Sequence, residues 1–147
     1  MERDAFGFFH PFRVRYSEID LQGVVFNAHY LTYFDTAITE YFRSLGVDVI
    51  AEAKATGVDF HTVRSLVEYK APIRLDQEID VGCRAVRLGR SSLTLALAIF
   101  ARGDTRLLAS GEIVWVNTDQ RTHKPVAIGE RLRAILRRRE GARLTDG

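Results

Sequence analysis

The fold is decided by the stretch Tyr16-Ser17-Glu18-Ile19-Asp20-Leu21-Gln22-Gly23-Val24-Val25-Phe26-Asn27-Ala28-His29-Tyr30. This stretch is a short acidic turn that contains a glycine and joins a strand-like segment to an amphipathic segment. A carboxylate on such a turn faces the start of the helix that follows, where unpaired backbone N–H groups and the positive end of the helix dipole stabilise negative charge. We therefore expect the residues that carry out the chemistry of the protein to lie at this turn.

The segments on either side of the turn have different periodicities. Before it, Phe12, Val14 and Tyr16 alternate with arginines, which is the period-2 pattern of a half-buried strand. After it, apolar residues recur every three or four positions and predict a helix over residues 28–45, about 27 Å long. Asn27 is predicted to cap the start of this helix, and Gly46 to end it in the left-handed conformation.

Most of the remaining chain is predicted to be β-structure. A second, shorter helix is expected near residues 47–55, before Gly57. After it, the pattern changes to period 2, with turn signals at Pro72, Gly89 and Gly103. The predicted strands are 60–69, 78–88, 92–101 and 105–117. The last three are joined so tightly that they should form an antiparallel meander.

Both faces of the segment from Leu93 to Phe100 are apolar, so both must be covered. Because one helix cannot cover both faces of a sheet, we expect the second face or a sheet edge to pack against another subunit. The sequence thus predicts a single α+β domain over residues 1–147 with its core at about 12–136. In this domain a curved antiparallel sheet of about five strands wraps one long central helix, and the protein is a homodimer or homotetramer.

Composition excludes several classes of protein. With 46% hydrophobic and 27% charged residues, the 147-residue chain has the profile of a globular domain rather than a disordered one. The acidic N-terminus does not fit a secretory signal, and the longest apolar stretch, Leu93 to Ala101, is too short to span a bilayer, so a cytoplasmic protein is expected. The single cysteine, Cys83, is interpreted as a small buried hydrophobe. No metal-ligand spacing occurs, and neither a metal nor another cofactor is predicted.

The basic residues collect near the C-terminus, although the net charge is only +2. We interpret this cluster as a solvated helix face, with contact to an anionic ligand such as phosphate as the alternative. Nucleic-acid binding is not expected, because no aromatic residues interleave with the arginines. The cluster consists of Arg131, Arg133, Arg137, Arg138 and Arg139.

The acidic turn resembles that of the 4-hydroxybenzoyl-CoA thioesterase-like branch of the hotdog-fold acyl-CoA thioesterases. The shared pattern is a strand, an Asp, two residues, a Gly, two hydrophobes and an Asn/His-rich helix start. The resemblance extends over about residues 12–136, because later segments are similar in order and spacing. These segments are Glu68-Tyr69-Lys70-Ala71-Pro72-Ile73-Arg74-Leu75, Arg87-Leu88-Gly89-Arg90-Ser91-Ser92 and Ser110-Gly111-Glu112.

The resemblance implies an acyl-CoA substrate and an activity that hydrolyses the thioester. Asp20 would be the catalytic carboxylate, either as a nucleophile that forms a mixed anhydride or as a general base toward water. The backbone of Asn27 would supply the oxyanion donor. Gly23 would let the backbone approach the ligand, and Tyr30 and Phe26 would line the acyl pocket or belong to the core. His29 would contact the acyl group or a water, with a surface or interface role as the alternative.

The segment with Arg87, Arg90, Ser91 and Ser92 resembles the family region that contacts the phosphates of CoA, and a solvated turn is the alternative. Glu18 departs from the Thr or Asp often seen near its position, and we interpret it as a solvated neighbour of Asp20 that could raise the pKa of Asp20 if close.

Two other functions use the same fold. A hotdog dehydratase or hydratase would need a His paired with an acid, for which only His29 is available. A non-catalytic acyl-CoA-binding protein would use the same cavity without turnover. A variant with a Glu on the central helix would have to use Glu40. A serine hydrolase is disfavoured because no Gly-x-Ser-x-Gly elbow occurs. The sequence leaves the acyl specificity open, because a pocket lined by Tyr30, Tyr33, Phe34 or Phe60 could take an aromatic ring or a fatty chain.

Overall fold

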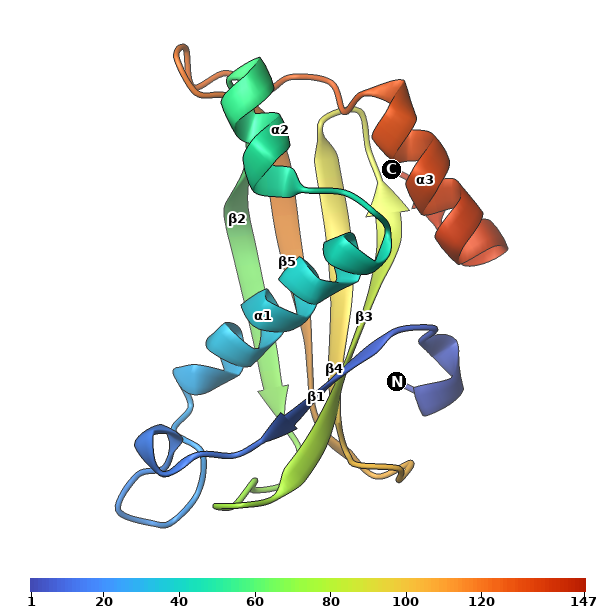
Figure 1. The fold of residues 1–147 in the computed structure, drawn as a ribbon. Coiled ribbons are helices and arrows are strands. Elements are labelled where there is room, and N and C mark those ends of the chain that lie inside the picture. Colours follow the sequence, from blue (N-terminus) through green and yellow to red (C-terminus); the bar gives the residue numbers. More distant parts are fainter. The chain divides into compact units, whose positions relative to one another are not determined.

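The structure, a computed structural model, describes all 147 residues and contains one six-stranded sheet and three α-helices (Figure 1). The strands are β1 (Phe9–Arg13), β2 (Val58–Tyr69), β3 (Glu78–Leu88), β4 (Ser92–Ala101), β5 (Leu107–Asp119) and β6 (Thr145–Asp146). The α-helices are α1 (His29–Ser44), α2 (Val49–Thr56) and α3 (Glu130–Glu140). Three single turns of 3₁₀-helix are η1 (Arg3–Ala5), η2 (Tyr16–Glu18) and η3 (Gly141–Arg143).

The strand order in the sheet is β1-β3-β4-β5-β2, and β6 pairs with β3 outside this path. Strand β1 runs antiparallel to β3, with Phe9 opposite Gly82 and Arg13 opposite Glu78, whereas β6 runs parallel to β3. The predicted α+β class is confirmed, and β3 and β4 have the predicted bounds. The sheet has six strands rather than about five because the two residues of β6 add to one side of β3.

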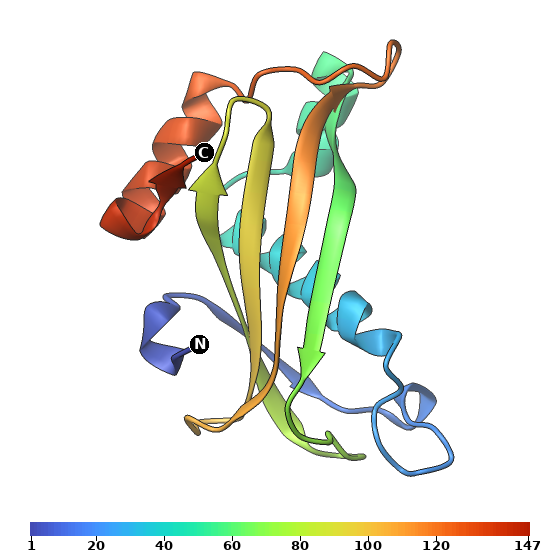
Figure 2. The same cartoon turned by 180° about the vertical axis from the view of Figure 1, so that it is seen from behind.

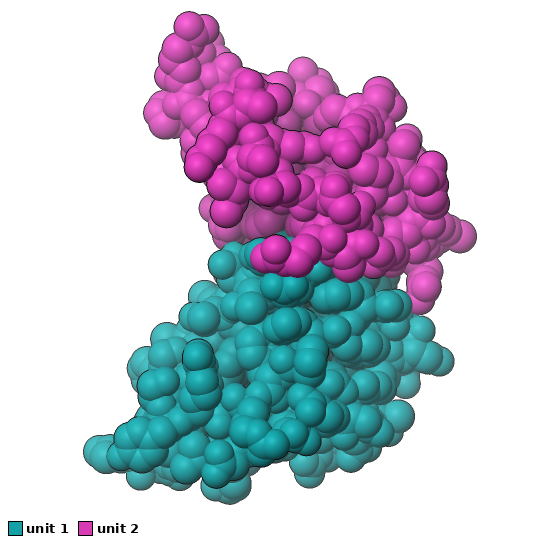
Figure 3. Space-filling model, viewed as in Figure 1, with its two compact units in different colours: residues 1–41, 66–84, 96–111 teal, residues 42–65, 85–95, 112–147 magenta.

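The chain divides into two compact units, coloured separately in Figure 3. Unit 1 comprises residues 1–41, 66–84 and 96–111, and unit 2 comprises residues 42–65, 85–95 and 112–147. Strands β2 to β5 and helix α1 each run through both units. Unit 1 contains the acidic turn and most of α1, while unit 2 contains α2 and α3.

The first strand lies earlier in the chain than predicted. Strand β1 ends at Arg13, and Tyr16, predicted to be its last half-buried residue, lies in η2 and is 81% exposed. The reason is local, because the backbone N–H of Glu18 donates to the carbonyl of Arg15 (3.0 Å), and the Glu18 carboxylate accepts the Arg15 N–H (2.8 Å). These two bonds favour a tight turn over an extended chain.

Helix α1 is one residue shorter at each end than predicted. Its 16 residues correspond to about 24 Å, so a long central helix is not confirmed. The predicted cap is wrong, since Asn27 lies two residues before the helix and its side chain forms no hydrogen bond. Its carbonyl accepts the Tyr30 N–H instead (3.3 Å). The predicted end is confirmed, because Gly46 has a φ of 76°.

In unit 1, α1 lies on one face of the strands, as the view from behind also shows (Figure 2). The helix and the sheet lie close together at Gly111 of β5, where an added Cβ would lie 2.5 Å from the Leu66 carbonyl oxygen and closer still to the Phe34 ring. Phe34 itself is completely buried. The missing side chain at position 111 therefore sets how near the helix comes to the sheet.

Strand β4 is buried on both faces within a single chain. Leu95, Leu97 and Ile99 on one side and Ala98 and Phe100 on the other have no exposed surface. Phe100 is covered by aromatic rings of the N-terminal segment, with ring centroids 6.3 Å from Phe6 and 6.1 Å from Phe9. Both faces are covered as expected, but the chain itself covers them, so β4 does not require a second subunit.

Candidate functional site

The acidic turn is a closed loop in unit 1. The Asp20 N–H donates to the Val24 carbonyl and the Gly23 N–H donates to the Asp20 carbonyl, both at 2.9 Å. Gly23 has a φ of 76° and open space where a Cβ would be. The turn therefore needs glycine for its backbone angle and not for lack of room.

The Asp20 carboxylate is half-buried and only partly engaged. Its Oδ1 accepts the Gln22 N–H at 2.8 Å, while its Oδ2 has no hydrogen-bond partner in the chain. Asp20 also lines a cavity of about 420 Å³ together with Asn27, Tyr30 and Lys70. One oxygen is thus held in place by the turn, and the other is available to a ligand.

The backbone before α1 contains an unpaired N–H donor. The N–H groups of Val25 and Phe26 are bonded to the carbonyls of Ile73 (2.8 Å) and Glu18 (2.9 Å), whereas the Asn27 N–H forms no hydrogen bond within the chain. Asn27 lines the same cavity as Asp20, so one cavity wall contains a residue with an unbonded carboxylate oxygen and a residue with an unbonded backbone N–H.

An aromatic pair lines the same cavity. The rings of Tyr30 and Tyr69 meet edge to face with centroids 4.8 Å apart, and the Tyr69 hydroxyl donates to the Asn27 carbonyl at 3.3 Å. Burial, and then the neighbouring Tyr69, raises the pKa of Tyr30. Sequence reasoning missed Tyr69 and Lys70 as site residues, although both lie in a segment that carries the family resemblance, just before Pro72.

The other predicted residues of the turn lie around the cavity without lining it. His29 is half-buried at the start of α1, with its ring 6.0 Å from that of Phe26, and neither His29 nor Gly23 lines the cavity. Of the aromatic residues considered for the acyl pocket, Tyr30 and Phe26 line this cavity, whereas Tyr33 and Phe34 are buried and do not line it. Phe60 lines a different cavity of about 260 Å³ in unit 2.

Glu18 is not a solvated neighbour of Asp20, which corrects the interpretation of the sequence. It is 5% exposed, and its carboxylate accepts hydrogen bonds from the Tyr33 hydroxyl (2.9 Å) and from the backbone and guanidinium of Arg15 (both 2.8 Å). Burial alone would raise the pKa of Glu18, but the bonds from Arg15 and Tyr33 together hold it below its ordinary value. Burial and the bond to Glu18 raise the pKa of Tyr33, which stays a donor.

The lowered pKa of Glu18 predicts a loss of stability in acid. The unfolded chain takes up a proton at this residue near the ordinary value of 4.5, and the folded chain does so only at lower pH. The ionised carboxylate therefore stabilises the fold fully above about pH 5, and this contribution is lost as the pH falls through the folded pKa. We expect the difference in unfolding free energy between wild type and Glu18→Gln to shrink between pH 6 and pH 3 in urea titrations. A difference that stays constant over this range would contradict this linkage.

The predicted phosphate-binding turn lies in unit 2 and is rigidly held through its backbone. The carbonyl of Arg90 accepts bonds from the Ile128 N–H (2.8 Å) and from the guanidinium of Arg133 (2.9 Å), while that of Ser91 accepts the Asn117 N–H (2.7 Å). The Arg90 side chain is exposed and forms no ion pair or hydrogen bond, and Ser91 and Ser92 are half-buried. The turn thus offers one uncommitted guanidinium.

The basic cluster near the C-terminus lies on α3, as predicted, but is only partly solvated. Arg131 and Arg137 are exposed and form ion pairs with Glu52 (2.7 Å) and Asp146 (3.5 Å). Arg133 is half-buried and donates to the carbonyls of residues 89 and 90. At least this arginine therefore holds the turn and is not a free surface charge.

Three further questions concern the single cysteine, metal ligands and membrane-spanning helices. Cys83 is fully buried, which confirms its interpretation as a core residue. No group of three or more His, Cys, Asp or Glu side chains is arranged to hold a metal ion. None of the helices is both long and apolar enough to cross a membrane.

Comparison with known proteins assigns the family. A family model for the Thioesterase superfamily matches residues 22–108, which is more than half of the chain. The chain belongs to the thioesterase superfamily. The matched range includes Gly23, Asn27 and Arg90, and it begins two residues after Asp20.

Individual thioesterases are similar over most of the chain. The acyl-CoA thioester hydrolase YbgC of Escherichia coli is 31% identical over 118 residues, which cover 80% of this chain and 87% of that protein. The crystal structure of PA5185 from Pseudomonas aeruginosa has 34% identity and a TM-score of 0.81, with 92% of each chain covered. A 1,4-dihydroxy-2-naphthoyl-CoA thioesterase from Synechocystis has a TM-score of 0.82 at 15% identity, over 88% of this chain and 94% of that one, and shares the fold. The resemblance to hotdog-fold acyl-CoA thioesterases is thereby confirmed.

Proposed function

We propose that this protein hydrolyses an acyl-CoA thioester to a free acid and CoA, with Asp20 as its catalytic carboxylate. The observation that carries the proposal is that Asp20 and Asn27 line one cavity, with an unbonded carboxylate oxygen on the first and an unbonded backbone N–H on the second. The Escherichia coli relative is named an acyl-CoA thioester hydrolase, which supports the substrate class.

Two mechanisms fit this arrangement. In the first, Oδ2 of Asp20 attacks the thioester carbon, the CoA thiolate leaves, and water then hydrolyses the mixed anhydride. In the second, the carboxylate takes a proton from a water that attacks the same carbon. In both, the Asn27 N–H donates to the oxygen that becomes negative, and the hydrogen bond from Gln22 keeps the carboxylate oriented.

The remaining substrate contacts are assigned by the chemistry of each residue. Tyr30 lines the cavity and contacts the acyl group there. His29 and Gly23 do not line the cavity, and they contact the substrate from the residues around it. In unit 2, the free guanidinium of Arg90 binds a phosphate of CoA, and the hydroxyls of Ser91 and Ser92 donate to the same group.

If Arg90 binds a phosphate of CoA, replacing Arg90 should weaken the binding of CoA. CoA should raise the Tm of the wild-type protein, and Arg90→Ala should weaken binding by about tenfold, as expected for a lost charge-assisted contact. Arg138→Ala, which removes an exposed arginine from α3, is the matched control, and CoA should raise its Tm as much as that of the wild type. Equal shifts in both variants would reject Arg90 as the phosphate contact.

We also propose that the chain forms one hotdog domain, with its core over about residues 12–136 and its sheet wrapped around α1, and that it assembles as a homodimer or homotetramer. The strands that run through both units support the single domain. The assembly is supported by β2, an edge strand of twelve residues on which Val63, Leu66 and Tyr69 are exposed. Sedimentation equilibrium should give at least a dimer at micromolar concentration, and a monomer would contradict the assembly.

The function is tested by thiol release from short, long and aromatic acyl-CoA esters. We expect turnover of at least one class, with the preferred class defining the acyl specificity. Binding of every ester without release of CoA would favour a non-catalytic acyl-CoA-binding protein. Hydration or dehydration of an acyl-CoA without thiol release would favour a dehydratase or hydratase and overturn the proposal.

A further inference from the structure

We propose that Glu18 is a positioning residue, which sets the geometry of the catalytic turn through a buried hydrogen bond to Tyr33 of α1. This inference rests on the proposed function, because the groups that Glu18 would position are Asp20 and the Asn27 N–H. Glu18 does not line the cavity, so it acts through the chain and not on the substrate.

The backbone of Glu18 closes the loop that contains the catalytic carboxylate. Its carbonyl accepts the Phe26 N–H at 2.9 Å, and a β-bridge joins Ile19 to Val25 just inside that bond. Asp20 lies within the closed loop, and Asn27 directly follows Phe26. A displacement of the Glu18–Phe26 pair therefore moves both proposed catalytic groups.

The side chain of Glu18 ties this closure to the helix. Its Oε1 accepts bonds from the Tyr33 hydroxyl (2.9 Å) and from the Arg15 N–H (2.8 Å), and its Oε2 accepts two from the Arg15 guanidinium (3.2 and 2.8 Å). A carboxylate with four donors around it has few alternative orientations. Arg15, in the segment before the loop, and Tyr33, in α1, thus both hold the side chain of Glu18, whose backbone closes the loop.

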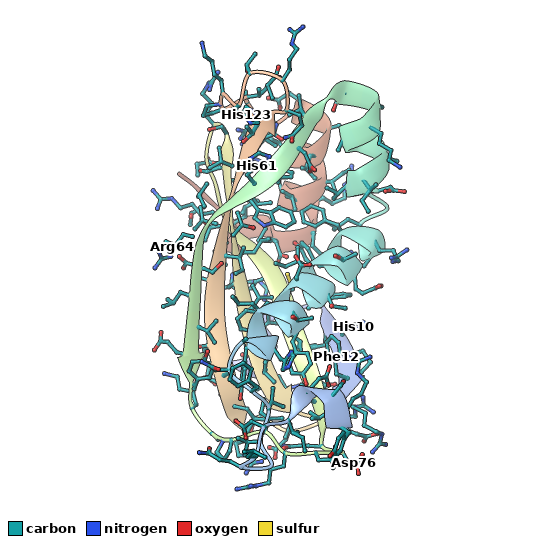
Figure 4. The ribbon with its side chains drawn as sticks, turned by 90° about the vertical axis from the view of Figure 1, so that its left-hand side faces the viewer. His10, Phe12, His61, Arg64, Asp76 and His123 are labelled. Atoms are coloured by element: carbon teal, nitrogen blue, oxygen red, sulfur yellow. The ribbon has the colours of Figure 1, made fainter.

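The side chain of Tyr33, which donates to Glu18, is held in place by packing. It is 1% exposed, and its ring centroid lies 5.1 Å from that of Phe12 and 6.4 Å from that of Tyr30. Figure 4 shows Phe12 on β1 beside the first turns of α1. Because packing holds the ring, the hydroxyl has a defined position, and Glu18 is placed relative to the helix start that supplies the oxyanion donor.

The bond to Tyr33 distinguishes this contact from an ordinary surface ion pair. The Arg15 side chain is 73% exposed, so its pairing with Glu18 alone would hold the loop weakly. The ion pair between Arg13 and Glu78 (2.7 Å) is similar in chemistry and lies in the same unit, but neither residue contacts the loop. Glu78→Gln is therefore a matched control for Glu18→Gln.

The experiment compares Glu18→Gln, Tyr33→Phe and Glu78→Gln with the wild type. We expect the first two to lower kcat by about 10- to 100-fold with less than a threefold change in KM, since small displacements of reacting groups have effects of this size. The double variant Glu18→Gln/Tyr33→Phe should lose less than the product of the two single losses, because the two side chains belong to one hydrogen-bond network. Glu78→Gln should keep the wild-type kcat.

A second measurement separates this inference from the proposed function. In amide hydrogen exchange, the Phe26 N–H should exchange at least tenfold faster in Glu18→Gln and Tyr33→Phe than in the wild type, whatever reaction the protein catalyses. If Asp20→Asn keeps full activity while this protection is lost, the proposed function fails and the positioning role stands. If the Phe26 protection and kcat both stay at wild-type values while only Tm falls, Glu18 serves stability alone and the inference is overturned.

Discussion

Asp20→Asn is expected to lower kcat for acyl-CoA hydrolysis by about 10² to 10⁴-fold, the scale of a lost acid–base group. The amide oxygen can still accept the Gln22 N–H that Oδ1 accepts at 2.8 Å, so the turn should keep its shape. The amide nitrogen, however, can neither attack a thioester nor take a proton from water. KM should change by less than threefold, because the change removes chemistry and leaves the cavity wall in place.

The loss is measured by thiol release, for which the chain is well suited because its single cysteine is buried and will react slowly with a thiol reagent. Asp104→Asn is the matched control. Asp104 also accepts backbone N–H bonds from the next residues, at 2.7 Å and 3.3 Å, but does not line the cavity. Turnover by Asp20→Asn equal to that of the control would remove Asp20 from the mechanism.

Gly111→Ala is expected to destabilise the fold by about 2 to 3 kcal/mol, which is typical of an overpacked core position. The added methyl group would lie 2.5 Å from the Leu66 carbonyl oxygen and even closer to the Phe34 ring, so either the helix or the strand must move. For a chain of this size the expected fall in Tm is about 6 to 10 °C. Differential scanning calorimetry measures it directly.

Gly7→Ala is the control for this substitution, because nothing lies within 4 Å of an added Cβ at that position. It should leave Tm unchanged or slightly higher, as expected when a glycine is replaced without strain. If Gly111→Ala were as stable as Gly7→Ala, the close approach of α1 to β5 would not be a constraint on the core.

Local patterns were sufficient for the elements that are bounded by strong turn residues. The bounds of β3 and β4 were predicted to the residue, because Gly89 and Gly103 break the alternation between apolar strands. The left-handed Gly46 was predicted from its place at the end of the apolar stripe. In each case the deciding interaction joins residues that are close in sequence, and periodicity reports such interactions well.

The errors arose where distant residues decide the structure. Nothing near Glu18 indicates that Tyr33, fifteen positions later, donates to its carboxylate. For the same reason the sequence did not reveal that the Tyr69 hydroxyl, 42 positions away, bonds to the Asn27 carbonyl. The two residues of β6 are too few to form a recognisable pattern. Polar partners chosen by tertiary packing leave no periodic signal in the chain.

Tyr69 lies both on the proposed interface between subunits and next to the proposed oxyanion donor. It is the last residue of the edge strand β2 and is 52% exposed, yet its hydroxyl bonds to the Asn27 carbonyl next to the proposed oxyanion donor. If a second copy pairs along β2, it covers the Tyr69 ring and restricts its motion. Specific activity would then depend on protein concentration, and dilution below the dissociation constant would inactivate the protein without unfolding it.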